Sequence, residues 1–378
     1  MTDSRTKEEV IQRHLANEML QAPILSPMRH SSQDLSVDHP TVPPLPDVIE
    51  RAVRALAEGQ THYVDVPGIG PLREALAGYL HGMGLAGFQQ DNVLVTAGMQ
   101  EARFLSIQIV GDLLGGLALP CVVHPGARKA VGVRQLDVRS MATCEASGFL
   151  PKVSEIRKAL ERGSKLLYLE SPVRLTGATF DVVSVREIAR AIAEFDAAVI
   201  WDQGLAPWVA DYASLGAEPG MEERVVVLGE AWPGAGLESW LVAYVAARED
   251  WWEEMRKQKQ VMSICTSTPS QFAATRAAET YPALHEKQWS ELSHYREEAL
   301  ELARELLVEP VRGAAVNLLA WRAQYPEQAK GALHGGGFAF ADGADFGAPG
   351  VLRLSVTPEN TIAEAVKSLR QPTGQGDT

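Results

Sequence analysis

The sequence is poor in the features that mark several classes of protein. Its three cysteines are odd in number and never occur in a C-x-x-C spacing, which argues against a disulfide framework or a structural zinc site. Its longest apolar run, residues 240–247, is far shorter than the ~20 residues that a membrane-spanning helix needs. The N-terminus, MTDSRTKEEV, has no apolar signal core. These absences predict a cytoplasmic protein with no membrane partner.

Positive charge is also in short supply. The formal net charge of -13 would repel phosphate backbones, which argues against nucleic acid as a partner. Lysine is absent altogether between Lys165 and Lys257. The sequence shows no metal-ligand cluster, so no metal is expected. What is present is ordinary: 378 residues, of which 46% are hydrophobic, are enough for two domains with full-sized cores.

The two ends of the chain are predicted to lie outside those domains. Residues 1–45 indicate an N-terminal arm, with a short helix expected at residues 7–19. Four prolines between positions 40 and 46 then oppose regular structure. The C-terminal tail QPTGQGDT, residues 371–378, is predicted to be disordered.

From residue 72 onward, amphipathic helices alternate with short apolar runs. Strands are predicted at residues 92–98, 121–125, 165–171, 197–202, 224–230 and 239–247. Apolar strands between amphipathic helices are typical of a mostly parallel sheet covered on both faces. We therefore predict an α/β fold whose large domain, with its sheet sandwiched by helices, spans residues 46–262.

A smaller C-terminal domain is predicted at residues 263–370. The helical stretch from residue 251 to 261 would leave the large domain, and its run WWEEMRKQKQ is interpreted as the solvated face of a long helix. Residues 280–370 predict the order helix, strand, strand, helix, with a tight turn at HGGG. This order is typical of an α+β domain packed on the large one, with the N-terminal arm against it.

Four segments carry a resemblance to a known family, in the family's order. They are THYVDVPGIGPLREALAGYL; VLVTAGMQEA; the pair ESPVRLTG and VIWDQGLAPWV; and APGVLRLSVTPE. Together they resemble class I/II aminotransferases, which are pyridoxal-phosphate (PLP) enzymes of fold type I, over about residues 35–370. The resemblance implies the PLP-transferase fold and a homodimer, because the active sites of this family are built at a subunit interface.

The resemblance assigns roles to several residues. Asp202 matches the carboxylate that keeps the cofactor's pyridine nitrogen protonated, although a turn aspartate would look the same. Arg353 matches the arginine that binds the substrate carboxylate in a bidentate pair. Tyr63 matches a tyrosine that reaches the phosphate of the neighbouring subunit, although a tyrosine here could simply pack in the interface. The phosphate-binding turn is matched by Gly98, Met99 and Gln100, which could equally form a plain strand-to-helix connection.

The same comparison exposes departures from the family pattern. Aligned on Tyr244, the segment GEAWPGAGLESWLVAY places Pro233 where the Schiff-base lysine is expected, and proline cannot form an imine. Leu241 stands in place of the phosphate-binding arginine. Arg174 stands in place of the asparagine that hydrogen-bonds the cofactor's 3-oxygen. Leu205 and Ala127 replace two aromatic residues of the site. We therefore expect no covalently bound PLP, and at most PLP or its amine form held non-covalently.

The changed residues define a hypothetical pocket. Arg174 either neutralises Asp202 directly or presents its guanidinium to an anionic ligand, with Arg353 at the other end. Trp232 is assigned to substrate binding, and Trp201 and Trp208 are further candidate walls, although tryptophans beside apolar neighbours are usually core.

Acid–base chemistry in this pocket would need further groups. His124 and Glu230 are the candidate acid/base residues. The alternative for His124 is a hydrogen-bonded histidine at the end of a strand.

Three functions remain open, and the retention of Arg353 favours the first, an enzyme. The first is a PLP-independent enzyme of small-molecule biosynthesis that takes a carboxylate-bearing substrate. The second is a non-catalytic subunit or scaffold that pairs with an active homologue. The third is an enzyme that binds PLP or its amine form non-covalently.

Overall fold

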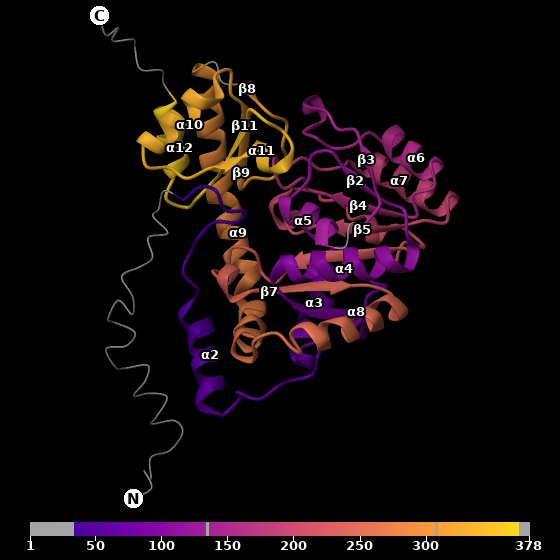
Figure 1. Ribbon diagram of the computed structural model, residues 1–378. Helices are drawn as coiled ribbons and strands as arrows, with labels where there is room; N and C mark the ends of the chain where they lie inside the picture. Colours follow the sequence, from indigo (N-terminus) through magenta and orange to yellow (C-terminus); the bar gives the residue numbers. More distant parts are fainter. Residues whose placement is uncertain (1–33, 134–135, 307–308, 370–378) are drawn as a thin grey trace, which may run out of the picture.

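Two sheets and their helices make up the part of the protein that the computed structural model describes, residues 34–133, 136–306 and 309–369 (Figure 1). The larger group of elements carries the seven-stranded sheet, and the smaller group lies beside it at the upper end of the long helix α9 (Thr268–Glu305). The helix predicted at residues 7–19 and the tail at residues 371–378 lie outside the described residues.

The large sheet has the order β1-β7-β6-β5-β4-β2-β3 in the described chain. All its neighbours pair in parallel except β7, which is antiparallel to both β1 and β6. The predicted mostly parallel sheet is therefore confirmed. Its strands are β1 (Val93–Ala97), β2 (Leu117–Pro120), β3 (Val138–Met141), β4 (Leu166–Glu170), β5 (Ala198–Asp202), β6 (Val225–Glu230) and β7 (Val242–Ala246).

Helices cover both faces of this sheet because its strands bury alternate side chains in two separate clusters. In β5, Ile200 belongs to the cluster under α4, α5 and α8, whereas Val199 and Trp201 belong to the cluster under α3, α6 and α7. The six helices are α3 (Gly70–Gly82), α4 (Gly98–Leu114), α5 (Pro125–Val133), α6 (Val153–Glu161), α7 (Val182–Glu194) and α8 (Glu249–Met262).

The strand predicted at residues 121–125 is wrong. The strand in that part of the chain is β2, which ends at Pro120, and the chain enters α5 at Pro125. Val122 and Val123 are buried all the same. Val122 packs with residues of the small domain, whereas Val123 packs in the core cluster under α4 and α5, and its N–H donates to the carbonyl of Phe346 at 3.0 Å. Apolar β-branched residues here serve the burial of a loop, which the residue pattern alone does not distinguish from a strand.

The helix predicted to leave the large domain at residues 251–261 stays within it. It forms α8, which packs Trp251 and Met255 into the core cluster that α4 shares. The element that runs between the two groups is α9, whose Ala277 and Tyr281 pack with the large sheet and whose Leu292 packs with the small one. The domain boundaries at residues 46, 262 and 370 stay predictions.

The small sheet has the order β10-β11-β9-β8 in the described chain, and all its pairs are antiparallel. The predicted sequence helix, strand, strand, helix is incomplete, because β8 and β10 have only two residues and show no periodicity. The elements are β8 (Glu309–Pro310), β9 (Leu318–Arg322), α10 (Pro326–Gly335), β10 (Ala341–Asp342), α11 (Gly343–Phe346), β11 (Val351–Ser355) and α12 (Thr361–Ser368).

The described end of the N-terminal arm lies against the small sheet. Leu35 N–H donates to the carbonyl of Ala339 at 3.0 Å, and the carbonyl of Leu35 accepts from Ser355 N–H at 2.8 Å. From there the chain passes between the two groups of elements before α2 (Pro46–Ala57) packs on α9 (Figure 1). This path carries residues 36–39 past the carboxyl edge of the large sheet.

Candidate functional site

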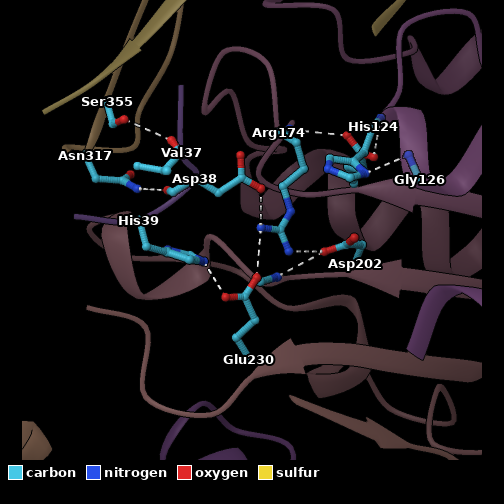
Figure 2. A network of polar contacts seen from close by, with 12 residues as sticks. Val37, Asp38, His39, His124, Gly126, Arg174, Asp202, Glu230, Asn317 and Ser355 are labelled. Atoms are coloured by element: carbon cyan, nitrogen blue, oxygen red, sulfur yellow. Dashed lines mark hydrogen bonds and ion pairs between the residues drawn. The ribbon is translucent and has the colours of Figure 1, made fainter. Parts of the chain in front are cut away.

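Three carboxylates stand at the ends of neighbouring parallel strands. Glu170 is the last residue of β4, Asp202 of β5 and Glu230 of β6. The carboxyl ends of parallel strands meet at one edge of a sheet, where open α/β folds bind their ligands. This edge is therefore the candidate site, and Figure 2 shows the polar network that occupies it.

Asp202 is fully buried, and both its oxygens have partners within the chain. Oδ1 accepts from Arg174 Nη2 at 3.0 Å and from Gly204 N–H at 3.2 Å. Oδ2 accepts from Arg103 Nε and from the Tyr168 hydroxyl, each at 2.9 Å. Although burial alone would raise it, the two guanidinium groups hold the pKa of Asp202 well below its usual range.

Arg174 is the centre of the network. Its buried guanidinium lies 3.1 Å from Asp38, 3.2 Å from Glu230 and 3.0 Å from Asp202, as the dashed lines of Figure 2 mark. Gly204 makes this position accessible, since a Cβ there would lie 1.9 Å from Arg174 Nη2. Of the two outcomes predicted for Arg174, this geometry corresponds to direct neutralisation of Asp202.

Arg353 reaches the same network from β11, where it is 1% exposed. Its Nη1 donates to Asp38 Oδ1 at 2.6 Å and to the carbonyl of Arg174 at 2.8 Å. Its Nη2 donates to the carbonyls of Ser36 and Val37. The guanidinium that the resemblance assigns to a substrate carboxylate is therefore bonded to a carboxylate of the chain itself.

Asp38 and His39 enter the site from the N-terminal segment. Asp38 bridges Arg174 and Arg353, and the two positive charges hold its pKa far below the usual range although burial opposes them. His39 Nδ1 accepts from Trp208 Nε1 at 3.1 Å, and its Nε2 lies 2.7 Å from Glu230. The sequence interpretation did not include either residue.

Glu170 and His124 form a second group beside Asp202. Glu170 accepts from His124 N–H at 2.7 Å and from Arg174 N–H at 3.2 Å. Burial and the nearby Asp202 raise the pKa of Glu170 to about 7. Burial and the charge of Arg103 lower the pKa of His124 to about 3, so its imidazole is neutral at pH 7 and a weak base.

Glu230 is held as an anion. Burial raises the pKa of Glu230, but the charges of His39 and Arg174 lower it by more, so the pKa lies below its usual value. A carboxylate that is already ion-paired is a poor proton donor at neutral pH. Of the two candidate acid/base residues, His124 and Glu230, neither has a pKa near 7 in this arrangement.

The predicted phosphate-binding turn lies at the N-terminus of α4. Gly98 has φ +75°, and the side chain of Leu241 lies against it, 3.1 Å from where a Cβ of Gly98 would be. Gln100 donates to the carbonyl of Gly126 at 3.0 Å. The cavity beside the turn measures about 140 Å³ and is lined by Gly98, Met99, Glu230, Ala231, Pro233, Leu237, Glu238, Leu241 and Val242.

Other predicted residues lie away from the centre of the network, although Trp208 donates to His39. Tyr63 is 78% exposed, in the loop before α3. Trp201 and Trp208 are fully buried, so neither presents a wall to a ligand. Trp232 is buried, but its ring contacts Tyr79 and Tyr281 on α3 and α9 rather than the network.

Comparison with known proteins identifies the family. The family model for aminotransferase class I and II matches residues 31–369. The chain belongs to the class I and II aminotransferase family. Aspartate/prephenate aminotransferase of Thermus thermophilus is 26% identical over 345 residues, 87% of each chain. A probable aspartate/prephenate aminotransferase of Aquifex aeolicus is 23% identical over 352 residues, 86% of this chain and 87% of that protein.

Solved structures of aminotransferases share the fold. A Thermus thermophilus aspartate aminotransferase mutant aligns with a TM-score of 0.81 at 23% identity, covering 98% of this chain and 97% of its own. The aromatic aminotransferase of Pyrococcus horikoshii aligns with a TM-score of 0.81 at 22% identity, over 94% of this chain and 97% of its own. The predicted PLP-transferase fold type I is confirmed.

The family is PLP-dependent, and the residues present here can be tested against that cofactor. Asp202 offers no free oxygen to a pyridine nitrogen, because four donors already occupy the carboxylate. The turn that would hold a phosphate faces Leu241, in a cavity well below the ~300 Å³ at which ligand pockets begin. These residues do not fit PLP in the described arrangement.

Two features are absent from the described residues. None of their helices is long and apolar enough to cross a membrane. No three or more His, Cys, Asp or Glu side chains among them are grouped so that they could hold a metal ion.

Proposed function

We propose that this chain is a non-catalytic subunit of the aminotransferase family, which has lost Schiff-base PLP chemistry and pairs with an active homologue or with itself. The loss rests on Pro233, which aligns with the Schiff-base lysine, and on the absence of lysine between Lys165 and Lys257. A second copy or a homologous subunit is the natural partner, because active sites in this family are built at subunit interfaces.

The observation that carries the proposal is the position of Arg174. Its guanidinium donates to the carboxylate that would otherwise keep a pyridine nitrogen protonated, and it also binds Asp38 and Glu230. A cofactor could reach Asp202 only by displacing the buried guanidinium from it, and breaking a buried ion pair costs several kcal/mol. The network therefore favours a closed cleft over a catalytic one.

The test of this proposal is titration of the purified protein with PLP. We expect neither an absorbance band of bound cofactor nor any change in its thermal midpoint, because Asp202 has no free oxygen. A Pro233→Lys variant restores an amine but leaves Arg174 in place, so it too should form no imine. Saturable PLP binding to the unmodified protein would reject the closed cleft and favour non-covalent PLP. Affinity purification from the source cells should recover a lysine-bearing family member or a second copy.

A second candidate is favoured by the bond between Arg353 and Asp38. Arginine holds this carboxylate at 2.6 Å as it would hold that of a substrate, and the side chain of Asp38 is 23% exposed. Under this hypothesis Asp38 withdraws and a carboxylate-bearing substrate takes its place, in a PLP-independent reaction.

Replacing Asp38 separates the two candidates. If the site accepts carboxylates, Asp38→Asn should bind succinate at least about tenfold more tightly than the unmodified protein, because an internal competitor is removed. The double variant Asp38→Asn, Arg353→Ala should lose that gain. Calorimetry that detects no succinate binding to any of the three proteins would reject the second candidate.

A further inference from the structure

A second cavity lies outside the charged network, on the other side of the segment that follows β6. It measures about 650 Å³ and is bounded by α3, by α9 and by Trp232. We call it the aromatic pocket; its lining residues are Pro71, Glu74, Ala75, Tyr79, Trp232, Thr275, Ala278, Glu279, Tyr281, Pro282 and His285. Its volume falls within the range of about 300–1,000 Å³ that is usual for small-molecule sites.

Three aromatic rings form the inner wall of the aromatic pocket. Tyr79 and Trp232 meet edge to face at 5.3 Å, and Trp232 and Tyr281 lie 5.5 Å apart at 52°. Tyr79 and Tyr281 complete the triangle at 6.3 Å and 75°. Three non-parallel rings offer both edges and faces to a flat ligand, and ring faces attract cations.

Two of the lining residues leave an acceptor without an N–H partner from the chain. Pro282 has no N–H to donate to the carbonyl of Ala278, one turn earlier in α9. His285 Nε2 lies 2.8 Å from the carbonyl of Pro207, which requires the proton on Nε2 and leaves Nδ1 as an acceptor. Burial lowers the pKa of His285, so the ring adds no positive charge at pH 7.

The charge of the lining is negative. Glu74 and Glu279 are its charged residues, and no lysine or arginine lines the pocket. Glu279 is paired with Arg276, whereas Glu74 has no ion-pair partner among the described residues. A bound cation would therefore meet one carboxylate that is free to pair with it.

Trp232 adds evidence that the pocket is built for a ligand. Its φ is +58°, a left-handed backbone conformation that costs energy for a bulky residue and is enriched at functional sites. Trp232 Nε1 and the Tyr281 hydroxyl are buried and have no hydrogen-bond partner among the described residues. The Tyr281 oxygen can accept a hydrogen bond, so an N–H group of a ligand would give it a partner.

We propose that the aromatic pocket binds a small organic ammonium compound with a flat apolar ring. The ring packs against Trp232, Tyr79 and Tyr281, and the ammonium lies near Glu74. This assignment is independent of the proposed closed cleft, because no residue that lines the aromatic pocket belongs to the charged network. It gives a subunit without Schiff-base chemistry a small-molecule site of its own.

Calorimetric titration with three indole probes tests the charge preference. Tryptamine carries an ammonium, indole-3-propionate a carboxylate, and indole no charge. We expect tryptamine to bind about tenfold more tightly than indole, and indole-3-propionate to bind more weakly than either. Equal affinity for tryptamine and indole-3-propionate would overturn the proposal. The proposal would also be overturned if tryptamine does not bind, whether or not a second copy of the chain covers the aromatic pocket.

Variants then locate the site. Glu74→Gln, on the exposed side of α3, should weaken tryptamine binding about threefold and leave indole binding unchanged. Its matched control is Glu364→Gln, an exposed carboxylate on α12, which should change neither. Trp232→Ala should abolish binding of all three probes, with circular dichroism as the check on folding. If Glu74→Gln and Glu364→Gln bind tryptamine equally, the ammonium does not lie in the aromatic pocket and the proposal fails.

Discussion

Arg174→Met is expected to lower the free energy of unfolding by about 3–5 kcal/mol, because it leaves buried carboxylates without their shared cation. Arg174 is fully buried and binds Asp202, which is also fully buried, together with Asp38 and Glu230. Methionine preserves most of the side-chain volume, so the loss reports charge rather than a cavity. Urea unfolding, followed by circular dichroism, measures the change.

An exposed arginine provides the matched control. Arg157 donates to Glu194 at 2.8 Å, but its side chain is 37% exposed and that of Glu194 is 55% exposed. Arg157→Met should therefore cost less than about 1 kcal/mol. Adding Asp202→Asn to Arg174→Met should recover part of the loss, since it removes one of the stranded charges. If Arg174→Met and Arg157→Met lower the free energy of unfolding equally, Arg174 does not stabilise the fold through its buried partners.

Gly204 leaves the space that the guanidinium of Arg174 occupies beside Asp202. Its Cβ would lie within 2 Å of Arg174 Nη2, so the position is closed to any side chain while the guanidinium binds Asp202. The network thus depends on a glycine that the sequence does not distinguish from an ordinary turn glycine. The chemistry of the site is set by the space between residues as much as by their types.

The fold followed from the sequence because its signals are local. The apolar runs that became β1, β4, β5 and β6 stand between amphipathic helices, and a sheet covered on both faces needs this pattern. The loop at residues 121–125 carried the same apolar signal for another reason, because its two valines are buried, one against the small domain and one in the core under α4 and α5. β8 and β10 have two residues each, too few to show the alternation of apolar and polar residues by which a strand is predicted.

The site was only partly predictable because its members come from distant parts of the chain. The end of a buried strand marks Asp202, and Arg353 stands out as a charge in an apolar strand. Asp38 comes from a proline-rich stretch with no periodic signal, and it joins the network only through the path of the N-terminal segment. Arg103 did leave a signal, a charge within the apolar run of α4, whose place beside Asp202 depends on the tertiary fold.

The positive and negative charges of the network balance. Arg103, Arg174 and Arg353 bring three positive charges to an edge where Asp38, Asp202 and Glu230 bring three negative ones. Each guanidinium in this set contacts at least one of the carboxylates. Glu170 lies beside them with its pKa raised to about 7 by burial and Asp202, so it adds little net charge below that pH. A cofactor bearing a phosphate would disturb this balance.

Lys259→Met is expected to cost about 3–5 kcal/mol, although its helix was interpreted as solvated. Lys259 is fully buried on α8, and its Nζ lies 2.7 Å from Glu101 Oε2 and 3.1 Å from Ser263 Oγ. Glu101 Oε2 also accepts from Ala97 N–H at 2.5 Å, at the start of α4. The variant strands that carboxylate in a site where its own side chain is 8% exposed.

Lys257, two residues away on the same helix, is the control. It pairs with Glu254, but both side chains are about half exposed, at 58% and 46%, so Lys257→Met should cost less than about 1 kcal/mol. The double variant Lys259→Met, Glu101→Gln should be more stable than Lys259→Met alone, because it removes the stranded charge while an amide oxygen can still accept from Ala97 N–H. Urea midpoints of the unmodified protein, Lys259→Met, Glu101→Gln and the double variant measure the coupling between the two side chains. If Lys257→Met and Lys259→Met shift the midpoint equally, α8 does not anchor the start of α4 through a buried ion pair.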